Sequence, residues 1–339
     1  MENKIGILTL HNAINYGAYL QAFALQSTIR EMGYNAEIVN LEKHNSIERL
    51  KLIKCKHPKR VVYNYKLLKE FDKVKKQLFL SRKSVTEYST IIVGSDEMWN
   101  VINGSFVHRR EYFGEGIKAD NIITYAVSAN KVTSAEFKTI TNNQIDFGNF
   151  RSISVRDDNT YKLVKDITRR EVALVLDPTM IYPYWEKHIV PCIVKNFILV
   201  YSFTTYEDEK VAITEFAKKN NKKIISVGSY NPWCDENICA TPFEFLGYIK
   251  AADYVITSSF HGVAFSILFN KKFVIYPQGK GKVLDIMNRF ELHDRDVTRS
   301  VSLEATFQEQ INYDEINKKR EAFAKTSLEW LTSAINSAL

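Results

Sequence analysis

The sequence lacks any long run of apolar residues. Its 339 residues contain no stretch that approaches the apolar length needed to span a bilayer. The apolar run near the first residue is too short for a secretory signal, so we expect a cytoplasmic protein. Apolar residues make up 45% of the chain and charged residues 25%, which is ordinary for a soluble globular protein. At this length two domains are more common than one or three.

Cysteine is also scarce, and the four cysteines are scattered. Only Cys234 and Cys239 lie near each other, and neither a second pair nor a histidine stands at zinc-ligand spacing. The pattern favours reduced thiols in a cytosolic chain, with no bound metal. Asp294 and Asp296 form only a weak metal motif, because Arg295 separates the two carboxylates.

The glycine-rich nucleotide motifs are absent as well. No G-x-G-x-x-G and no Walker loop occurs, and the chain has neither internal repeats nor low-complexity segments. What the chain does contain is an alternation of short apolar runs and amphipathic segments. This alternation predicts parallel sheets with helices between the strands.

The alternation occurs in two blocks. The first predicts strands at 4–10, 34–41, 89–95, 121–130, 150–157 and 171–179, with helices at 18–33 and 159–167. The second predicts strands at 196–203, 222–230, 253–259 and 272–277, with helices at 206–221, 241–252 and 262–270. We therefore expect an α/β fold with two Rossmann-like, doubly wound domains that face a cleft. The expected ranges are 1–185 and 190–310, followed by a helix over 313–339 that returns to the first domain.

Charge is concentrated in one segment. Residues 43–84 hold fourteen Lys or Arg against three acidic residues, a local charge of +11, so the rest of the chain carries −4 of the overall +7. The apolar spacing within the segment predicts an amphipathic helix. A solvated helix face is the more common explanation. The sharper alternative is attraction to an anionic membrane surface or to a phosphorylated acceptor. Nucleic acid is disfavoured because no nucleic-acid motif accompanies the charge.

Polar side chains follow the predicted strands of the first block, where α/β sheets bind ligands. Asn12, Asn15 and Tyr16 follow the first strand, and Gly17 permits a close approach there. The third strand is followed by Asp96, Glu97 and Trp99. An acidic pair beside an indole ring is typical of a site for a polyhydroxy ligand. The alternative is a capped helix with Trp99 in the core, and the pattern favours the ligand site only modestly. A turn with a helix cap explains the first group equally well.

Two further charged residues stand at strand ends of the first block. Arg156 is placed to bind a carboxylate or phosphate, although a surface ion pair with Asp157 or Asp158 is the more common local outcome. Asp177 precedes a proline and is a helix cap, or an acid or base that faces the cleft.

The stretch 258–262 joins a predicted buried strand to a predicted helix. Ser258, Ser259, Phe260 and Gly262 surround His261 at this helix N-terminus, where free backbone N–H groups and serine hydroxyls favour an anion. A histidine here acts as a base when neutral and pairs with an anion when protonated. Further along the chain, Lys280, Lys282 and Arg289 can complete a basic cradle for phosphate.

Five motifs in order, NYGAYLQAFALQ, GSDEMWN, SVRD, LDPT and TSSFHGVAFSILFNKKF, resemble the polysaccharide pyruvyltransferase family. The correspondence runs from about residue 5 to residue 295. The family more often has Gln in place of Glu97. The resemblance implies a GT-B-like fold and a transferase that moves the enolpyruvyl carbons of phosphoenolpyruvate onto two hydroxyls of a hexose. The product is a cyclic pyruvate ketal on a cell-surface polysaccharide precursor, of the kind found in bacterial capsules and exopolysaccharides.

The resemblance assigns Arg156 and His261 to donor binding and catalysis, with His261 as the candidate general base or phosphate ligand and Asp177 as a weaker candidate acid. Residues 258–262, Lys280 and Lys282 are expected to complete the donor site. The acceptor, a hexose-containing and lipid-linked saccharide, is expected to contact residues of the first block: Asn12, Asn15, Tyr16, Asp96, Glu97 and Trp99. Phosphoenolpyruvate is a co-substrate, and no cofactor is expected. The alternatives are a nucleotide-sugar glycosyltransferase of GT-B fold and a non-catalytic sugar-binding relative.

Overall fold

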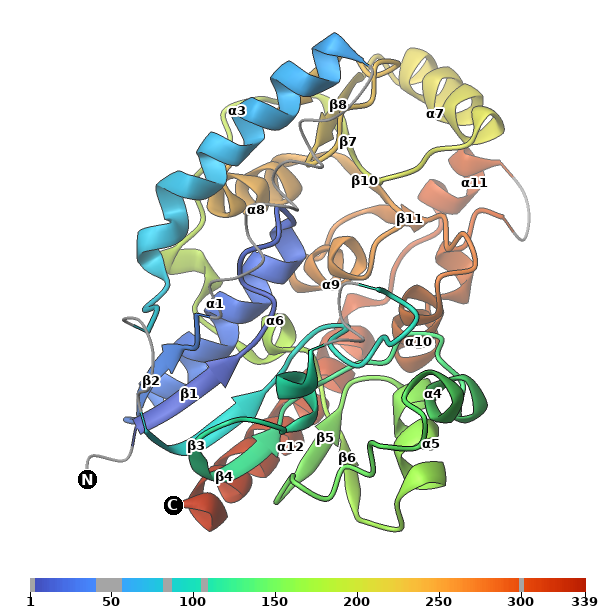
Figure 1. Ribbon diagram of the computed structural model, residues 1–339. Helices are drawn as coiled ribbons and strands as arrows, with labels where there is room; N and C mark the ends of the chain where they lie inside the picture. Colours follow the sequence, from blue (N-terminus) through green and yellow to red (C-terminus); the bar gives the residue numbers. More distant parts are fainter. Residues whose placement is uncertain (1–3, 41–56, 82–86, 105–108, 299–301) are drawn as a thin grey trace.

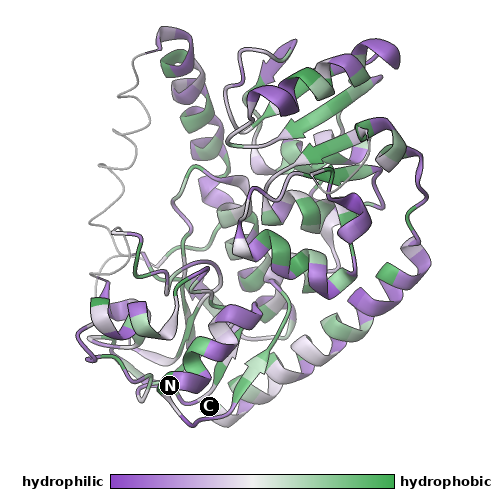
Figure 2. Cartoon of the chain, turned by 90° about the vertical axis from the view of Figure 1, so that its right-hand side faces the viewer, coloured by the Kyte–Doolittle hydropathy of each residue, from purple (hydrophilic) through white to green (hydrophobic). Residues whose placement is uncertain are grey.

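The computed structural model describes residues 4–40, 57–81, 87–104, 109–298 and 302–339. Two parallel sheets lie at opposite ends of the molecule, with helices packed between and around them (Figure 1). The apolar strands of both sheets are green in Figure 2, whereas the helices turn purple, hydrophilic residues outward. The two-block α/β prediction is therefore confirmed.

The first sheet has four strands in the order β2-β1-β3-β4, all parallel. Isolated bridges from Ile123 to Ser152 and from Val127 to Val155 attach a further parallel pair, β5 and β6, beside β4. The bounds of these strands are β1 Lys4–Leu8, β2 Asn35–Ile38, β3 Tyr88–Val93, β4 Ala119–Thr124, β5 Ile153–Val155 and β6 Val172–Leu174.

The second sheet has five parallel strands in the order β11-β10-β7-β8-β9. Its bounds are β7 Phe197–Tyr201, β8 Lys223–Val227, β9 Glu236–Ile238, β10 Tyr254–Thr257 and β11 Phe273–Ile275. The strands β1–β6 therefore precede residue 175, and β7–β11 follow residue 196. The domain boundary expected between residues 185 and 190 falls in the segment between these two sets of strands and stays a prediction.

The helices cover the faces of the sheets and fill the space between them (Figure 1). Asn15 caps α1 by accepting from Ala18 N, and Gly33 follows its end with φ +91°, the left-handed conformation that favours glycine. The α-helices are α1 Tyr16–Glu31, α3 Pro58–Val74, α4 Ser134–Ile140, α5 Asp158–Ile167, α6 Pro178–Ile181, α7 Glu207–Lys219, α8 Pro242–Ala251, α9 Phe260–Leu268, α10 Gly281–Phe290, α11 Leu303–Gln308 and α12 Tyr313–Ala338. Short 3₁₀ turns are η2 Lys75–Gln77, η3 Arg110–Phe113, η4 Trp185–Lys187 and η5 His293–Arg295.

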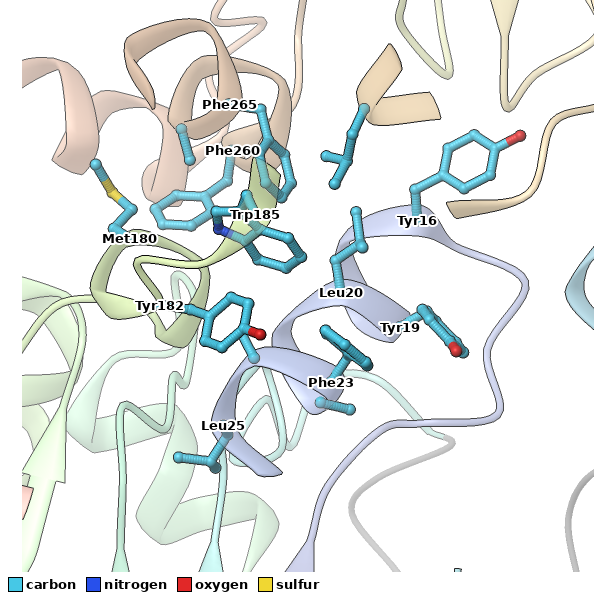
Figure 3. Packing of buried hydrophobic residues seen from close by; sticks show 14 of the residues in the cluster. Tyr16, Tyr19, Leu20, Phe23, Leu25, Met180, Tyr182, Trp185, Phe260 and Phe265 are labelled. Atoms are coloured by element: carbon cyan, nitrogen blue, oxygen red, sulfur yellow. The ribbon is translucent and has the colours of Figure 1, made fainter. Parts of the chain in front are cut away.

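The helix α1 lies at the centre of the molecule and joins its two halves. It is buried on nearly every side, and its apolar side chains form one cluster with residues from both sheets. Figure 3 shows Leu20 and Phe23 of α1 in one cluster with Trp185 and Phe265, and the rings of Phe23 and Trp185 lie 6.1 Å apart between centroids. Because one continuous apolar core spans both halves, their relative position is set by packing and not by a hinge alone.

The C-terminal helix α12 returns to the first sheet, as predicted. The side chains of Thr90 and Asn121, on β3 and β4, donate hydrogen bonds to the carbonyl oxygen of Ala338 at 3.0 and 2.7 Å. None of the described helices is long and apolar enough to cross a membrane.

The basic segment contains the predicted amphipathic helix as α3. Its apolar side chains, among them Tyr63, Leu67 and Phe71, are buried, while the lysines face outward. In Figure 1 this helix runs along the outer edge of the molecule from β2 to the neighbourhood of β8. Residues 41–56 and 82–86 of the basic region lie outside the described residues.

Candidate active site

Turns that follow strands of both sheets converge at the centre of the molecule. Asp96 follows β3, Arg156 follows β5 and Asp177 follows β6 in the first half, and His261 follows β10 in the second. Ligands of open α/β sheets bind at such carboxyl ends. The structure therefore brings four of the predicted site residues into one cluster.

Arg156 is the hub of this cluster. Its guanidinium donates to Asp177 Oδ2 from Nη1 at 2.7 Å and to Asp96 Oδ1 from Nη2 at 3.0 Å. The ring of Phe260 lies 4.8 Å from its Cζ, and the residue is only 2% exposed. Both terminal nitrogens are thus bonded to carboxylates, while Nε has no partner among the described residues. A bidentate clamp on a ligand, which the sequence predicted, would have to displace one of these carboxylates.

The surface ion pair that sequence reasoning considered for Arg156 is wrong. Asp157 instead caps α5, where its Oδ1 accepts from Thr160 N at 2.8 Å. Asp158 lies on the surface, and its backbone N–H donates to Asp285. The Asp157 carboxylate is held at the helix start by Thr160, and the Asp158 carboxylate lies 4.0 Å from Arg289 Nη2 and not against Arg156.

Charge alternates through the cluster and keeps the acids ionised. Burial opposes ionisation of Asp96, but the charges of Arg156 and Lys282 lower its pKa below the ordinary value. Burial likewise opposes ionisation of Asp177, but the nearby charge of His261 and that of Arg156 hold its pKa well below the usual range. Burial lowers the pKa of Arg156, and the two aspartates outweigh it. Both oxygens of Asp177 accept hydrogen bonds, from Arg156 and from Thr179, which positions the carboxylate, and its role as an acid stays a prediction.

His261 lies between Asp177 and α1. Its Nε2 is 3.7 Å from Asp177 Oδ1 and makes no hydrogen bond within the described part of the chain. The residue is 7% exposed. Its ring packs on Gly17 so closely that a Cβ there would lie 1.9 Å from Nδ1. The absence of a side chain at Gly17 is what permits this approach.

The joint at 258–262 has the geometry expected of a strand-to-helix turn. Ser259 caps α9, and its hydroxyl accepts from Gly262 N at 3.0 Å. Gly262 has no room for a side chain, since a Cβ would lie 2.1 Å from Thr257 Oγ1. The close packing of Gly262 on Thr257 therefore fixes the backbone beside it, and with it the position of His261 as the second residue of α9.

A lysine from the second half lies over this joint. Lys280 Nζ donates to the carbonyl oxygen of Ser258 at 2.9 Å and to its hydroxyl at 3.0 Å. The Ser258 hydroxyl also contacts Ser202 Oγ at 2.7 Å. Burial and the charge of Lys282 lower the pKa of Lys280 from its ordinary value. Lys280 therefore lies beside the start of α9, and its role in a phosphate cradle stays a prediction.

Glu97 and Lys282, predicted on opposite sides of the cleft, form an ion pair with each other. Glu97 also accepts from Asn100 and Asn130, each at 3.0 Å. Burial opposes its ionisation, but Lys282 lowers the pKa of Glu97 below the ordinary value. This pair joins the start of α10 to the turn after β3.

Further contacts hold α10 against the first half of the molecule. Asp158 N donates to Asp285 Oδ1 at 3.0 Å, and Arg289 Nη1 donates to the carbonyl oxygen of Val175 at 3.4 Å. Burial raises the pKa of Asp285 to about 6, against the opposing charge of Arg289. Arg289 therefore links the two halves of the molecule, and it does not lie with Lys280 at the start of α9.

Trp99 does not line the site. It is 0% exposed, and its indole N–H donates to the carbonyl oxygen of Tyr112 at 2.8 Å within the core of the first sheet. Phe147 packs against it at 4.6 Å between ring centroids. The expectation that its ring contacts a sugar is wrong, because neighbouring aromatic rings already cover it.

The residues after β1 have mainly structural partners. Tyr16 is buried between α3 and α8, and its hydroxyl donates to the carbonyl oxygen of Ala240 at 2.9 Å. Asn15 caps α1, and Asn12 is hydrogen-bonded to the ring of His11 at 2.6 Å. Tyr16 is thus a second correction to the predicted acceptor set, since its ring and hydroxyl face the core.

Sequence reasoning missed two residues. Tyr201 ends β7 near Ser259 and Gly17, and burial raises the pKa of its hydroxyl well above the ordinary value. Lys131 follows β4 and approaches Gly279 and Gly281 from the first half. The strand-end rule that selected Arg156 applies equally to Tyr201, but the aromatic residue reads as ordinary core.

The described residues contain no group of three or more His, Cys, Asp or Glu side chains that could hold a metal ion. The cysteines at 192, 234 and 239 are free thiols, and Cys55 lies outside the described residues.

Solved structures with the same arrangement define the class. A protein described as a UDP-N-acetylglucosamine 2-epimerase from Listeria monocytogenes superposes with a TM-score of 0.52 at 8% identity, covering 99% of this chain and 96% of its own. The UDP-GlcNAc 2-epimerase from Neisseria meningitidis gives 0.50 at 7% identity, covering 98% and 99%. A Streptomyces glycosyltransferase complexed with thymidine diphosphate gives 0.47 at 9%, covering 97% and 99%. The fold is of the GT-B-like α/β class.

The family is narrower than the fold. The model of the polysaccharide pyruvyl transferase family matches residues 15–278, more than half of the 339 residues. The chain belongs to this family and is a transferase. No curated protein sequence matches it.

Proposed function

We propose that the protein transfers the enolpyruvyl carbons of phosphoenolpyruvate onto two hydroxyls of a hexose in a polysaccharide precursor. The observation that carries this proposal is the cluster at the cleft, where His261, Lys280 and the start of α9 lie together in a member of this family. A donor with one carboxylate and one phosphate needs several cationic and N–H groups. Lys280, Lys282 and the amides of α9 supply them without a metal.

The reaction balances with the groups available. C3 of the donor gains one proton, and an oxygen of the hexose bonds to C2. A second hydroxyl of the same hexose then replaces phosphate at C2 and closes the ketal. Of the two hydroxyl protons, one is matched by the proton on C3 and the other leaves with phosphate.

His261 is the group we assign to proton transfer. Its Nδ1 is packed against Gly17, whereas Nε2 makes no hydrogen bond among the described residues, so Nε2 is the atom that we assign to exchange a proton. The nearby carboxylate orients the ring and stabilises the positive charge that forms when the imidazole takes a proton. Asp177 is thus a positioning residue for both His261 and Arg156.

Arg156 organises the donor side. Because Asp96 and Asp177 already occupy its terminal nitrogens, we assign it to the donor through Nε and through its charge. Asp96 and Glu97 remain the acidic groups nearest the turn after β3, and they are the acceptor residues that the proposal retains with Asn12 and Asn15.

Substrates enter by separation of α10 from the first half. Arg156 and His261 are almost wholly buried, and the Glu97–Lys282 pair holds the start of α10 to the turn after β3. The phosphate of the donor competes with Glu97 for Lys282, so donor binding itself weakens this contact.

The test is incubation with phosphoenolpyruvate and a panel of galactose- and mannose-type hexosides, both water-soluble and lipid-linked. Released phosphate and the mass of the product are measured. His261→Ala should lose nearly all turnover, whereas the matched control His293→Ala, at an exposed histidine of η5, should retain it. Saturable binding of UDP or GDP without turnover of phosphoenolpyruvate would instead support the glycosyltransferase alternative. Glycan binding with neither activity would support a non-catalytic relative.

A further inference from the structure

One stripe of α3 is cationic and faces outward. Its members follow each other at intervals of three and four residues, so they lie on one side of the helix. All are exposed, and the exposed ring of Tyr65 lies beside the stripe with Lys69 Nζ 4.6 Å from its centroid. We call this the α3 face, and its residues are Lys59, Val62, Tyr65, Lys66, Lys69 and Lys73 of α3, together with Lys76 of the following turn η2.

The opposite side of the helix is fixed to both halves of the molecule. Tyr63 Oη donates to the carbonyl oxygen of Ile238 at 2.9 Å, in the second half. Tyr19 Oη donates to the carbonyl oxygen of Val74 at 2.8 Å, in the first. Phe71 stacks on Tyr16 at 5.3 Å between ring centroids. The α3 face is therefore held rigidly outward by contacts at both ends.

The charge of the α3 face is left largely uncompensated. Lys59, Lys66 and Lys69 have no ion pair among the described residues, and Lys73 pairs only with Glu70 of the same helix. From Pro58 to Lys76 the chain has seven Lys or Arg and two acidic residues, a net +5. Val62 and Tyr65 are 54% and 51% exposed within this charge. Cations that surround exposed apolar side chains match an anionic and partly apolar surface.

We propose that the α3 face docks on an anionic lipid bilayer. A bilayer presents a flat negative surface, and a straight helix at the outer edge of the molecule can lie along it (Figure 1). Lysines of the stripe contact lipid phosphates, while Val62 and Tyr65 enter the headgroup region. The surface deepens the proposed function by carrying the enzyme to membrane-borne acceptors, and it rests on that function only for this purpose.

The number of exposed lysines on the α3 face sets the expected strength of membrane binding. A lysine near an anionic membrane contributes about fivefold to partitioning, which corresponds to about 1 kcal/mol. Neutralising three lysines should therefore weaken binding roughly a hundredfold. Added salt should also weaken membrane binding of the unmodified protein, because the lysine charges are exposed and salt screens them.

The experiment is sedimentation with vesicles of phosphatidylcholine, with and without phosphatidylglycerol, at low and high salt. The test variant carries Lys66→Gln, Lys69→Gln and Lys73→Gln. The control removes the same charge from exposed lysines on other helices, with Lys138→Gln, Lys162→Gln and Lys325→Gln. Circular dichroism and thermal unfolding verify that both variants are folded.

The expected result is salt-sensitive binding to the anionic vesicles alone, lost in the test variant and kept in the control. Turnover of a water-soluble hexoside should be equal in all three proteins, so failure of the pyruvyl transfer would be seen separately. Equal vesicle binding by the two variants would overturn the proposal. So would retention of the protein on nucleic acid with no binding to vesicles, which would assign the α3 face to a different polyanion.

Discussion

Replacing Gly17 by alanine should disable His261 without touching any reacting group. The added Cβ would lie 1.9 Å from His261 Nδ1 and 2.4 Å from its Cγ. Ordinary contacts between such atoms are about 3.5 Å, so the ring must move by roughly 1.5 Å. The ring cannot move freely, because the joint around Gly262 fixes its backbone. A displacement of this size at a proton-transferring group lowers kcat by about a hundredfold.

The effect of Gly17→Ala on stability is the sum of two opposing terms. Overpacking of a dense site costs about 1–3 kcal/mol. Alanine in place of glycine in a helix restores about 1 kcal/mol. We therefore expect a net loss of about 0–2 kcal/mol in the free energy of unfolding, measured by denaturant titration beside phosphate-release kinetics.

A double-mutant cycle isolates the clash. In a His261→Ala background the imidazole is gone, so Gly17→Ala should no longer destabilise the protein. Gly104→Ala serves as the control, because nothing lies within 4 Å of the added Cβ there. Normal kcat in Gly17→Ala, or the same stability loss in both backgrounds, would refute the reasoning.

Three further predictions concern buried groups. Burial raises the pKa of Asp285 from 3.8 to about 6, so its ionisation destabilises the fold as pH rises through this range. The free energy of unfolding of Asp285→Asn, relative to wild type, should therefore rise by up to about 3 kcal/mol between acidic and neutral pH. A difference that does not change with pH would contradict this. Asp177 has a lowered pKa, so its ionised carboxylate stabilises the fold above about pH 4, and this stabilisation is lost as the pH falls further. Asp177→Asn should lower the free energy of unfolding by about 3–5 kcal/mol at neutral pH, and denaturant titrations should show that its stability depends less on acid pH. Trp99→Phe should lower the melting temperature yet leave KM for the acceptor unchanged, and a raised KM would return Trp99 to the site.

The ion pair between Glu97 and Lys282 is more informative than a simple stabilising contact. It joins a residue expected on the acceptor side to one expected on the donor side. In the proposed reaction the pair must open for the donor phosphate, and Glu97 is then released toward the acceptor. One contact would thereby couple the filling of one side of the cleft to the exposure of the other.

The local sequence predicted most strands and the longer helices, but it missed β9, α4, α10 and α11. Alternation of apolar residues determined the strands and helices, because burial of one face depends on the residue period alone. The same logic placed Asp96, Arg156 and His261 at strand ends and indicated a close approach at Gly17. The amphipathic spacing also predicted α3, since its buried and exposed sides follow from the order of its residues.

Only the tertiary structure decided which of these groups meet. Arg156 binds Asp96 and Asp177, which lie 60 and 21 residues away, and leaves the neighbouring Asp157 to cap a helix. Trp99 stands in a polar motif yet is covered by aromatic rings from distant segments. The physical reason is that the sequence determines the period of burial within an element, whereas charge pairing and ring packing depend on distances across the folded chain.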